Sequence, residues 1–185
     1  EAEQGKEGRR VLAVATRTFK GTAPRAEDGG LTLAGIISFE DPVKESTKTA
    51  MEHAKNLGVA VKILTGDSLE VAESVARQVG LISSTEGGMT GAKWAGLPEA
   101  ERDAAASSHA VFARVSPQQK YQIIESLRKT QEVGFLGEGI NDAPALKIAS
   151  VGIVVDGASD IAREAADIVL LHHSLEVIVG GIREG

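Results

Sequence analysis

The sequence predicts an α/β fold built on a parallel β-sheet that helices cover on both faces. Short runs that are apolar throughout alternate along the chain with segments whose apolar residues recur at helical spacing. A strand that is apolar throughout is buried on both faces, which is typical of parallel sheets. Repeated strand–helix alternation is the pattern of proteins in which crossover helices cover such a sheet.

The first half of the chain contains three predicted strands and two strongly amphipathic helices. The strands are expected at residues 11–18, 31–39 and 59–64, and the helices at 44–57 and 71–79, each followed by a glycine. Residues 21–30 are rich in Gly, Pro and acid, which favours a loop and marks a candidate boundary. Residues 83–96 are expected to form a loop and 97–108 a helix, to which the sequence assigns no role.

The second half continues the same alternation. A brief strand at 111–114 precedes the clearest helix start, where Pro117 takes the first helical position and Gln119 stands at capping-box distance from Ser116. This helix should run to about residue 129. Strands are then expected at 133–136, 151–155 and 168–171, and helices at 145–149, 159–165 and 175–182.

Composition excludes several classes of function. A net charge of −6 and 3% aromatic residues in 185 argue against a nucleic-acid platform, which needs a basic surface and stacking side chains. The absence of cysteine excludes disulfides and thiol chemistry, and fits a reducing compartment. No stretch approaches the roughly 20 apolar residues of a membrane helix, and residues 1–10 are too charged for a signal peptide. Since methionine occurs only at 51 and 89, we expect a piece of a longer protein.

The strongest chemical signal is the stretch from Gly134 to Leu146, Gly-Phe-Leu-Gly-Glu-Gly-Ile-Asn-Asp-Ala-Pro-Ala-Leu. It places Glu138, Asn141 and Asp142 at the carboxyl end of a predicted strand, which is where open α/β sheets bind ligands. Such oxygen ligands suit Mg²⁺, which binds through one or two carboxylates plus substrate phosphate. The alternative is an ordinary strand–turn–helix corner, because Gly, Asn and Asp are all turn residues.

Two more predicted strand ends carry residues that suit a phosphoryl group. Thr65-Gly66-Asp67 offers a hydroxyl and exposed backbone N–H groups, and Lys120 in the first turn of a helix offers an ammonium. Taken singly, Thr65 is better explained as a helix-capping turn and Lys120 as a solvated lysine. Their occurrence after successive strands, together with the acidic cluster, favours a phosphate and Mg²⁺ site. The four histidines have no metal-ligand spacing.

These motifs together resemble the haloacid dehalogenase superfamily and, more narrowly, the phosphorylation domain of P-type cation-transporting ATPases. Asp41-Pro42-Val43-Lys44 is similar to that family's hinge motif, and Phe112-Ala-Arg-Val-Ser-Pro-Gln-Gln-Lys120 to its lysine segment. The stretch from Val155 to Asp167 is most similar to the bacterial magnesium-transporting branch. The resemblance covers about residues 9–184 and implies a Rossmann-like sheet of the haloacid dehalogenase type.

The resemblance also implies roles for individual residues. Thr65 and Lys120 would contact the phosphoryl group, Asn141 would contact phosphate, and Gly66 and Asp67 would lie with them at the nucleotide. Glu138 would ligate Mg²⁺ and Asp142 would support the metal site. Mg²⁺ and ATP are the cofactors that the parent enzyme would use.

The chain departs from the family pattern in two places. Glu138 stands where the family has aspartate, and the added methylene moves a carboxylate that near-octahedral Mg²⁺ needs in place. The nucleophile motif Asp-Lys-Thr-Gly-Thr is absent, so the sheet should lack its central strand and show a gap or an inward shift of another strand. The isolated chain is therefore expected to be inactive. Residues 1–30 would end the nucleotide-binding domain and hinge, and 31–185 would be the second part of the phosphorylation domain.

The resemblance implies part of the cytoplasmic catalytic domain of an ATP-driven cation pump, transporting Mg²⁺. Its partners would be ATP, the cation and the remaining pump domains, with no nucleic acid. The segment itself is expected to be soluble and to lie at the cytoplasmic face of the cell membrane. Two alternatives stay open: a free-standing phosphatase, for which Asp41 is the available nucleophile, and a non-enzymatic regulatory fragment of the same fold. Against Asp41 stands Pro42, which has no N–H for phosphate.

Overall fold

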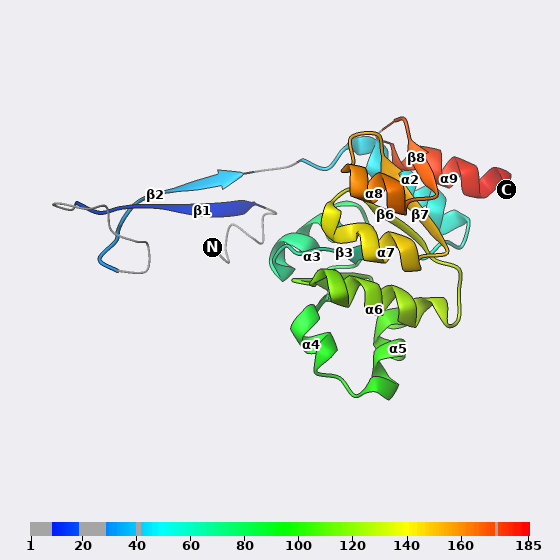
Figure 1. The fold of residues 1–185 in the computed structure, drawn as a ribbon, viewed down its shortest axis with the longest axis horizontal. Helices are drawn as coiled ribbons and strands as arrows, with labels where there is room; N and C mark the ends of the chain where they lie inside the picture. Colours follow the sequence, from blue (N-terminus) through cyan, green and yellow to red (C-terminus); the bar gives the residue numbers. More distant parts are fainter. Residues whose placement is uncertain (1–8, 19–28, 40–41, 173) are drawn as a thin grey trace.

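The computed structural model describes residues 9–18, 29–39, 42–172 and 174–185. The described strands and helices alternate along most of the chain (Figure 1). The strands are β1 (Arg10–Thr16), β2 (Thr32–Phe39), β3 (Ile63–Leu64), β4 (Met89–Thr90), β5 (Val111–Ala113), β6 (Gly134–Gly137), β7 (Val151–Val155) and β8 (Ile168–Leu170). The helices are α2 (Glu45–Asn56), α3 (Leu69–Gln78), α4 (Gly91–Ala95), α5 (Glu99–Ser108), α6 (Pro117–Arg128), the 3₁₀ turn η2 (Ile140–Asp142), α7 (Ala143–Ile148), α8 (Asp160–Ala165) and α9 (Leu175–Glu184).

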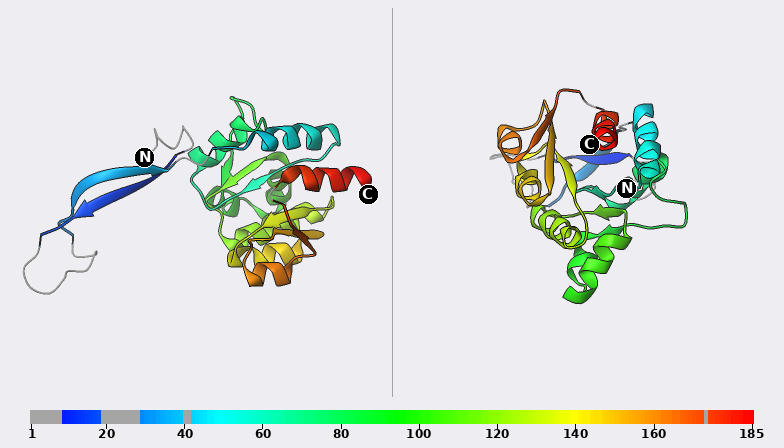
Figure 2. Two further views of the ribbon diagram at one scale, coloured as in Figure 1. Left: turned by 90° about the horizontal axis from the view of Figure 1, so that it is seen from above. Right: turned by 90° about the vertical axis from the view of Figure 1, so that its right-hand side faces the viewer.

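The body of the protein contains two three-stranded parallel sheets. Their strand orders are β3-β5-β4 and β6-β7-β8, and every pairing within them is parallel. Parallel pairing and the α/β class are as the sequence predicts. Figure 2 shows α7 and α8 on one side of β6–β8, with α9 and α2 on the other, so helices cover both faces.

The sheet is divided where the sequence predicts a missing central strand. β3 and β6 are edge strands of their respective sheets. Leu64 of β3 and Phe135, Leu136 and Gly137 of β6 line one common cleft, so the two edges border the same space. The predicted gap is therefore confirmed. β3 is shorter than the expected strand at residues 59–64, because only Ile63 and Leu64 pair with the three-residue strand β5.

The core is mostly aliphatic, and α6 contributes to apolar clusters on both of its sides. Ile123 and Leu127 of this helix pack with Phe112 of β5 and with Trp94 of α4. On its other side Ile124 packs with Ala145 of α7, which links the two sheets through their helices. Helix α2 packs on α9 through Ala50, Ala54 and Val179. None of the helices in the described ranges is both long and apolar enough to cross a membrane.

Strand β2 forms where the sequence predicts a strand but does not join the parallel sheets. It pairs antiparallel with β1 in a two-stranded ribbon that extends away from the body (Figure 1). Its apolar sequence is typical of a strand buried on both faces, yet Leu33, Ile36 and Ile37 are exposed by 60, 62 and 47%. The strand expected at residues 31–39 is therefore present, but an apolar run reveals neither the direction nor the partner of a strand.

The segment predicted as a loop at residues 83–96 contains two regular elements. β4 pairs in parallel with β5, and α4 follows it directly. Both elements are short, and Trp94 of α4 is buried against α6. Sequence periodicity missed them because a two-residue strand is defined by its partner and a five-residue helix has too few turns to show a pattern.

Candidate functional site

Three strand ends supply the residues of the candidate site. Thr65-Gly66-Asp67 follows β3, the helix α6 carrying Lys120 follows β5, and Glu138 follows β6. Because β3 and β5 are parallel neighbours, their carboxyl ends lie at the same edge of one sheet. The local sequence fixes the start of α6 as predicted: Ser116 and Gln119 form a reciprocal capping box, with Pro117 at the first turn.

An ion pair brings the second sheet to the same place. Nζ of Lys120 lies 2.7 Å from Oδ1 of Asp142, and the two side chains are only 17 and 13% exposed. The other carboxylate oxygen of Asp142 accepts hydrogen bonds from the backbone N–H groups of Glu138 and Gly139, at 3.3 and 3.2 Å. One oxygen of the Asp142 carboxylate therefore binds the backbone of the turn after β6, and the other oxygen binds the ammonium of Lys120.

These contacts set the ionisation of Asp142. Burial is the largest single influence and favours the neutral acid, but the hydrogen bond and charge of Lys120, with the N–H groups of Gly139 and Glu138, outweigh it. The net effect lowers the pKa of Asp142 below its ordinary value. Asp142 is therefore a carboxylate at neutral pH, and it carries the charge that keeps the Lys120 ammonium in position.

Gly137 allows the turn to close this tightly. A Cβ at Gly137 would stand 2.8 Å from Cβ of Asp142, which no real side chain tolerates. The next residue, Glu138, uses its backbone fully, donating to Asp142 and accepting from the N–H of Ser159 at 3.0 Å. Its exposed carboxylate has no hydrogen bond or ion pair with any residue that the structure describes. Glu138 therefore presents a carboxylate that can bind a ligand.

Thr65 lies in a turn that is closed by its own side chain. Its hydroxyl donates to Oδ2 of Asp67 at 2.9 Å and accepts from the N–H of Asp67 at 3.1 Å. The turn is attached to the segment after β5, because the N–H of Val115 donates to the carbonyl of Thr65 and that of Arg114 to the carbonyl of Asp67. Gly66 is exposed and has open space around it.

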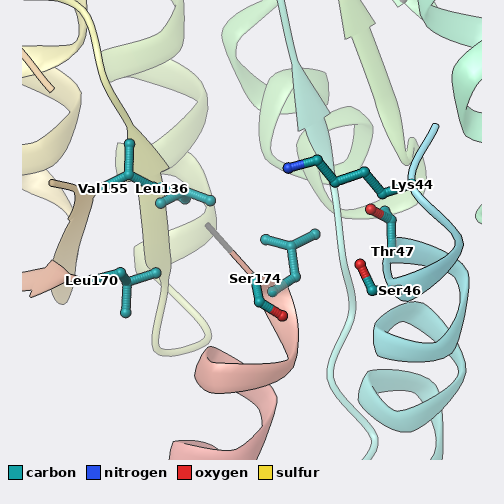
Figure 3. A pocket seen from close by; sticks show the side chains of 8 residues that line it. Lys44, Ser46, Thr47, Leu136, Val155, Leu170 and Ser174 are labelled. Atoms are coloured by element: carbon teal, nitrogen blue, oxygen red, sulfur yellow. The ribbon is translucent and has the colours of Figure 1, made fainter. Parts of the chain in front are cut away.

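The site borders a cleft that runs between the two sheets. It encloses about 290 Å³ and is lined by Lys120, Glu138 and Asp142, and by the apolar residues Leu64, Phe135, Leu136, Gly137 and Val155. A neighbouring cleft of about 190 Å³ shares Leu136 and Val155 with it. Figure 3 shows Leu136, Val155 and Leu170 on one side of that second cleft and Lys44, Ser46 and Thr47 on the other. The cleft between the sheets is thus lined mainly by apolar residues, and its charged lining residues are Lys120, Glu138 and Asp142.

The structure brings three of the expected residues together and places the others around them. Lys120, Glu138 and Asp142 line the cleft, and Thr65 directly follows the lining residue Leu64. Asp67 lies behind Thr65 in its turn, and Asn141 is exposed on η2 without lining the cleft. Asp41 falls outside the described residues. Sequence reasoning passed over Arg114, which is exposed beside the Thr65 turn with a left-handed φ of 51°, a strain that no sequence signal reveals.

The carboxylates present suit a hydrated Mg²⁺ and not an ion enclosed by protein. The described residues contain no group of three or more His, Asp or Glu side chains placed to hold a metal. Glu138 offers free oxygens, and Asp142 stands four residues later with its oxygens already hydrogen-bonded. Mg²⁺ keeps several waters and binds through one or two carboxylates plus substrate phosphate, so this donor set fits it.

Comparisons with known proteins agree with the motifs. Residues 4–150 match the family model of haloacid dehalogenase-like hydrolases. Over 184 residues the chain is 46% identical to proteins named magnesium-transporting ATPase, P-type 1, of Salmonella typhimurium and Escherichia coli, covering 97% of this chain and 20% of each relative. It is 35% identical over 188 residues to a probable cation-transporting ATPase F of Mycobacterium bovis, covering 96% of this chain and 21% of that protein.

The chain thus spans about a fifth of the length of these relatives. The resemblance read from the Thr65, Lys120 and Glu138–Asp142 motifs is confirmed, including the similarity to magnesium-transporting P-type ATPases. Because the family model covers most of the sequence and the parallel α/β architecture agrees with it, the chain belongs to the haloacid dehalogenase-like hydrolase family.

Proposed function

We propose that this chain is part of the catalytic domain of an ATP-driven P-type cation pump, on the cytoplasmic side of the membrane, with Mg²⁺ as the transported ion. The observation that carries the proposal is the Lys120–Asp142 pair, which joins the ends of two parallel sheets at a cleft that also contains Glu138. The names of the relatives support the assignment to cation transport and to magnesium.

In this proposal the chain's own residues bind and orient a phosphoryl group. The ammonium of Lys120 offsets the negative charge of the phosphoryl oxygens, and Asp142 fixes where that ammonium stands. The Thr65 hydroxyl exchanges its hydrogen bond to Asp67 for one to a phosphate oxygen. The backbone N–H of Gly66 donates to phosphate beside it, because the N–H groups of Thr65 and Asp67 already have acceptors within the chain. The Asn141 amide reaches phosphate from η2. When bound at Glu138 and Asp142, Mg²⁺ supplies further neutralisation of developing charge.

The nucleophile in this proposal is an aspartate on a strand supplied by the rest of the protein. The unpaired edges of β3 and β6 and the apolar lining between them support the insertion of one strand there. The aspartate at its carboxyl end attacks the γ-phosphorus of ATP and ADP leaves, which gives an aspartyl-phosphate. Water then releases phosphate and restores the carboxylate, so one difficult displacement becomes two easier ones.

The ribbon of β1 and β2 is proposed to belong to the nucleotide-binding domain of the parent protein. Leu12 and Ile37 are opposite each other on one face, and Ala13 and Ile36 on the next pair point to the other. All four are exposed, so both faces need cover from residues outside this chain. The pairing of the two strands supports placing the domain boundary after Phe39, and not at residue 30.

The decisive experiment restores the missing strand. A synthetic peptide with an apolar strand ending in Asp-Lys-Thr-Gly-Thr is added to the chain with Mg²⁺ and ATP labelled on its γ-phosphate. We expect label on the peptide aspartate, as an acyl phosphate that hydroxylamine removes, and no label with the peptide aspartate changed to asparagine. A peptide that binds without being labelled, at any ATP concentration tested, would favour the regulatory alternative.

The same labelling experiment also tests the alternative of a free-standing phosphatase. The chain without peptide should not become labelled, and beryllium fluoride should not be retained at Asp41, because Pro42 offers no N–H to a phosphate there. Label that maps to Asp41 and disappears in Asp41→Asn would overturn the proposal and support the phosphatase.

A further inference from the structure

We infer that Gln119 is a positioning residue for Lys120, because its side chain fastens the first turn of α6 to the backbone of Gly91. The inference rests on the proposed function, in which Lys120 meets the phosphoryl group. It also gives a role to residues 83–108, for which the sequence indicates none.

The amide of Gln119 makes hydrogen bonds in two directions. Its Oε1 accepts from the backbone N–H of Ser116 at 2.9 Å, which belongs to the cap of α6. Its Nε2 donates to the carbonyl of Gly91 at 2.9 Å, 28 residues earlier in the chain. The amide oxygen therefore caps α6 itself, and the amide nitrogen connects α6 to the start of α4.

Gly91 is a rigid anchor for this bond. It begins α4 directly after β4, and β4 pairs in parallel with β5, the strand that precedes α6. Gly91 is buried, and a Cβ there would collide with Oε1 of Gln119 and stand 2.8 Å from the carbonyl of Arg114. The backbone at Gly91 thus lies against the Gln119 side chain and the Arg114 carbonyl, with no room for a larger residue.

The bond acts on the residue next in the chain. Lys120 shares the first turn of α6 with Gln119, and its Nζ reaches Asp142 across the cleft. Further along, Ile123 and Leu127 pack on Trp94, so the body of the helix is held by apolar contacts. None of residues 117–120 belongs to the apolar clusters formed by the described residues, so polar contacts restrain the first turn, and the Gln119–Gly91 bond is the one that ties it to α4. Loss of this restraint would let the Lys120 ammonium leave Asp142 more often.

The variant Gln119→Glu removes the hydrogen bond to Gly91 and keeps the one from Ser116. A carboxylate of the same shape still accepts from Ser116, which preserves the cap, but it cannot donate to Gly91 and repels its carbonyl. The readout is the rate at which an amine-reactive reagent acylates Lys120, mapped by mass spectrometry and normalised to the exposed Lys129 of the same molecule. We expect about fivefold faster acylation of Lys120, the ratio that corresponds to one lost hydrogen bond.

The matched control is Ser116→Ala, which removes the hydroxyl that accepts from the N–H of Gln119 but leaves the bond to Gly91. It should acylate Lys120 as slowly as the wild type. Should Gln119→Glu fail to fold, Gln119→Met keeps the size, lacks the donor and should acylate quickly. Unchanged acylation in the folded Gln119 variant, or an equal rise in Ser116→Ala, would overturn the inference.

A second readout separates this inference from the proposed function. With the nucleophile peptide added, Gln119→Glu should lower the rate of phosphoenzyme formation at saturating ATP, and Ser116→Ala should not. If the wild type forms no phosphoenzyme but the contrast in acylation persists, the proposed function fails and the positioning role stands. If the wild type forms phosphoenzyme and neither measurement distinguishes the variants, the positioning role fails alone.

Discussion

Nζ of Lys120 stands 2.7 Å from Oδ1 of Asp142, and this bond connects the helix after β5 to the turn after β6. The helix and the turn follow strands of two different sheets, and no described strand of one sheet pairs with a strand of the other. The same atoms that would bind a phosphoryl group and its metal therefore also hold the two halves of the body at a fixed spacing.

Removing the charge of Lys120 should destabilise the chain. In Lys120→Met the Asp142 carboxylate keeps its two N–H donors but loses its ammonium in a site that is mostly shielded from water. We expect the free energy of unfolding to fall by about 2 kcal/mol, measured by urea denaturation. The control is Lys129→Met, whose partner Asp103 lies on the surface, and which should leave the midpoint unchanged. Equal losses in both variants would contradict a special role for the Lys120–Asp142 pair.

The stabilising effect of Asp142 should depend on pH in a defined direction. Its pKa is lower in the folded chain than in the unfolded chain, so between these two values the unfolded state binds more protons. Stability from this group is therefore fully present above the unfolded pKa of about 4 and is lost as pH falls through the folded pKa. The difference in unfolding free energy between wild type and Asp142→Asn should be constant near neutrality and shrink in acid. A difference that grows on acidification would show that the pKa is raised.

Glu138→Asp should tighten Mg²⁺ binding when the nucleophile peptide is present. The glutamate carboxylate is exposed and makes no ion pair or hydrogen bond with a described residue, and its extra methylene places it one carbon–carbon bond further from the turn that holds Asp142. Mg²⁺ demands near-octahedral geometry at short distances, so the shorter side chain suits it better. Isothermal titration with Mg²⁺ measures the effect, with Glu132→Asp as a control for the same change outside the cleft. Equal or weaker binding by Glu138→Asp would mean that the turn accommodates the longer side chain.

Deletion of residues 1–41 should leave the body folded and reduce self-association. No residue of β1 or β2 belongs to the apolar clusters around α6, α7 and α9. The thermal midpoint should therefore change little. Meanwhile the loss of exposed Leu12, Leu33 and Ile36 should shift sedimentation towards the monomer. Leu33→Lys in the full chain is the milder test and should move sedimentation in the same direction. A large fall in midpoint on deletion would show that the ribbon supports the body.

Local signals in the sequence predicted local structure well. The Ser116, Pro117 and Gln119 pattern predicted both the start of α6 and its capping box, because those contacts lie within one turn. The sequence also led us to expect Thr65, Lys120, Glu138 and Asp142 at one edge of the sheet, because each follows the carboxyl end of a parallel strand. Lys120, Glu138 and Asp142 do line one cleft, and Thr65 directly follows the lining residue Leu64.

Relationships between distant segments were harder to predict. The antiparallel pairing of β2 with β1 depends on which strands are available, and an apolar run does not reveal it. Met89 and Thr90 form strand β4 only through their pairing with Phe112 and Ala113 of β5, more than 20 residues later in the chain. The hydrogen bond between Thr65 and Asp67 could have been foreseen from their spacing of two residues, which is typical of side-chain-closed turns.

The separation of the two sheets has a consequence for the order of folding. The strands of the first sheet and the helices between them come from residues 63–128, and those of the second from 134–170, so each half makes its contacts within a short stretch of chain. Pairings within either half close shorter loops than a pairing with a strand from outside it, and they therefore cost less loop entropy. A strand that inserts between β3 and β6 must come from outside both stretches and closes a long loop. The halves should therefore form first, and the arrival of the last strand would complete the sheet and the phosphate site in a single step.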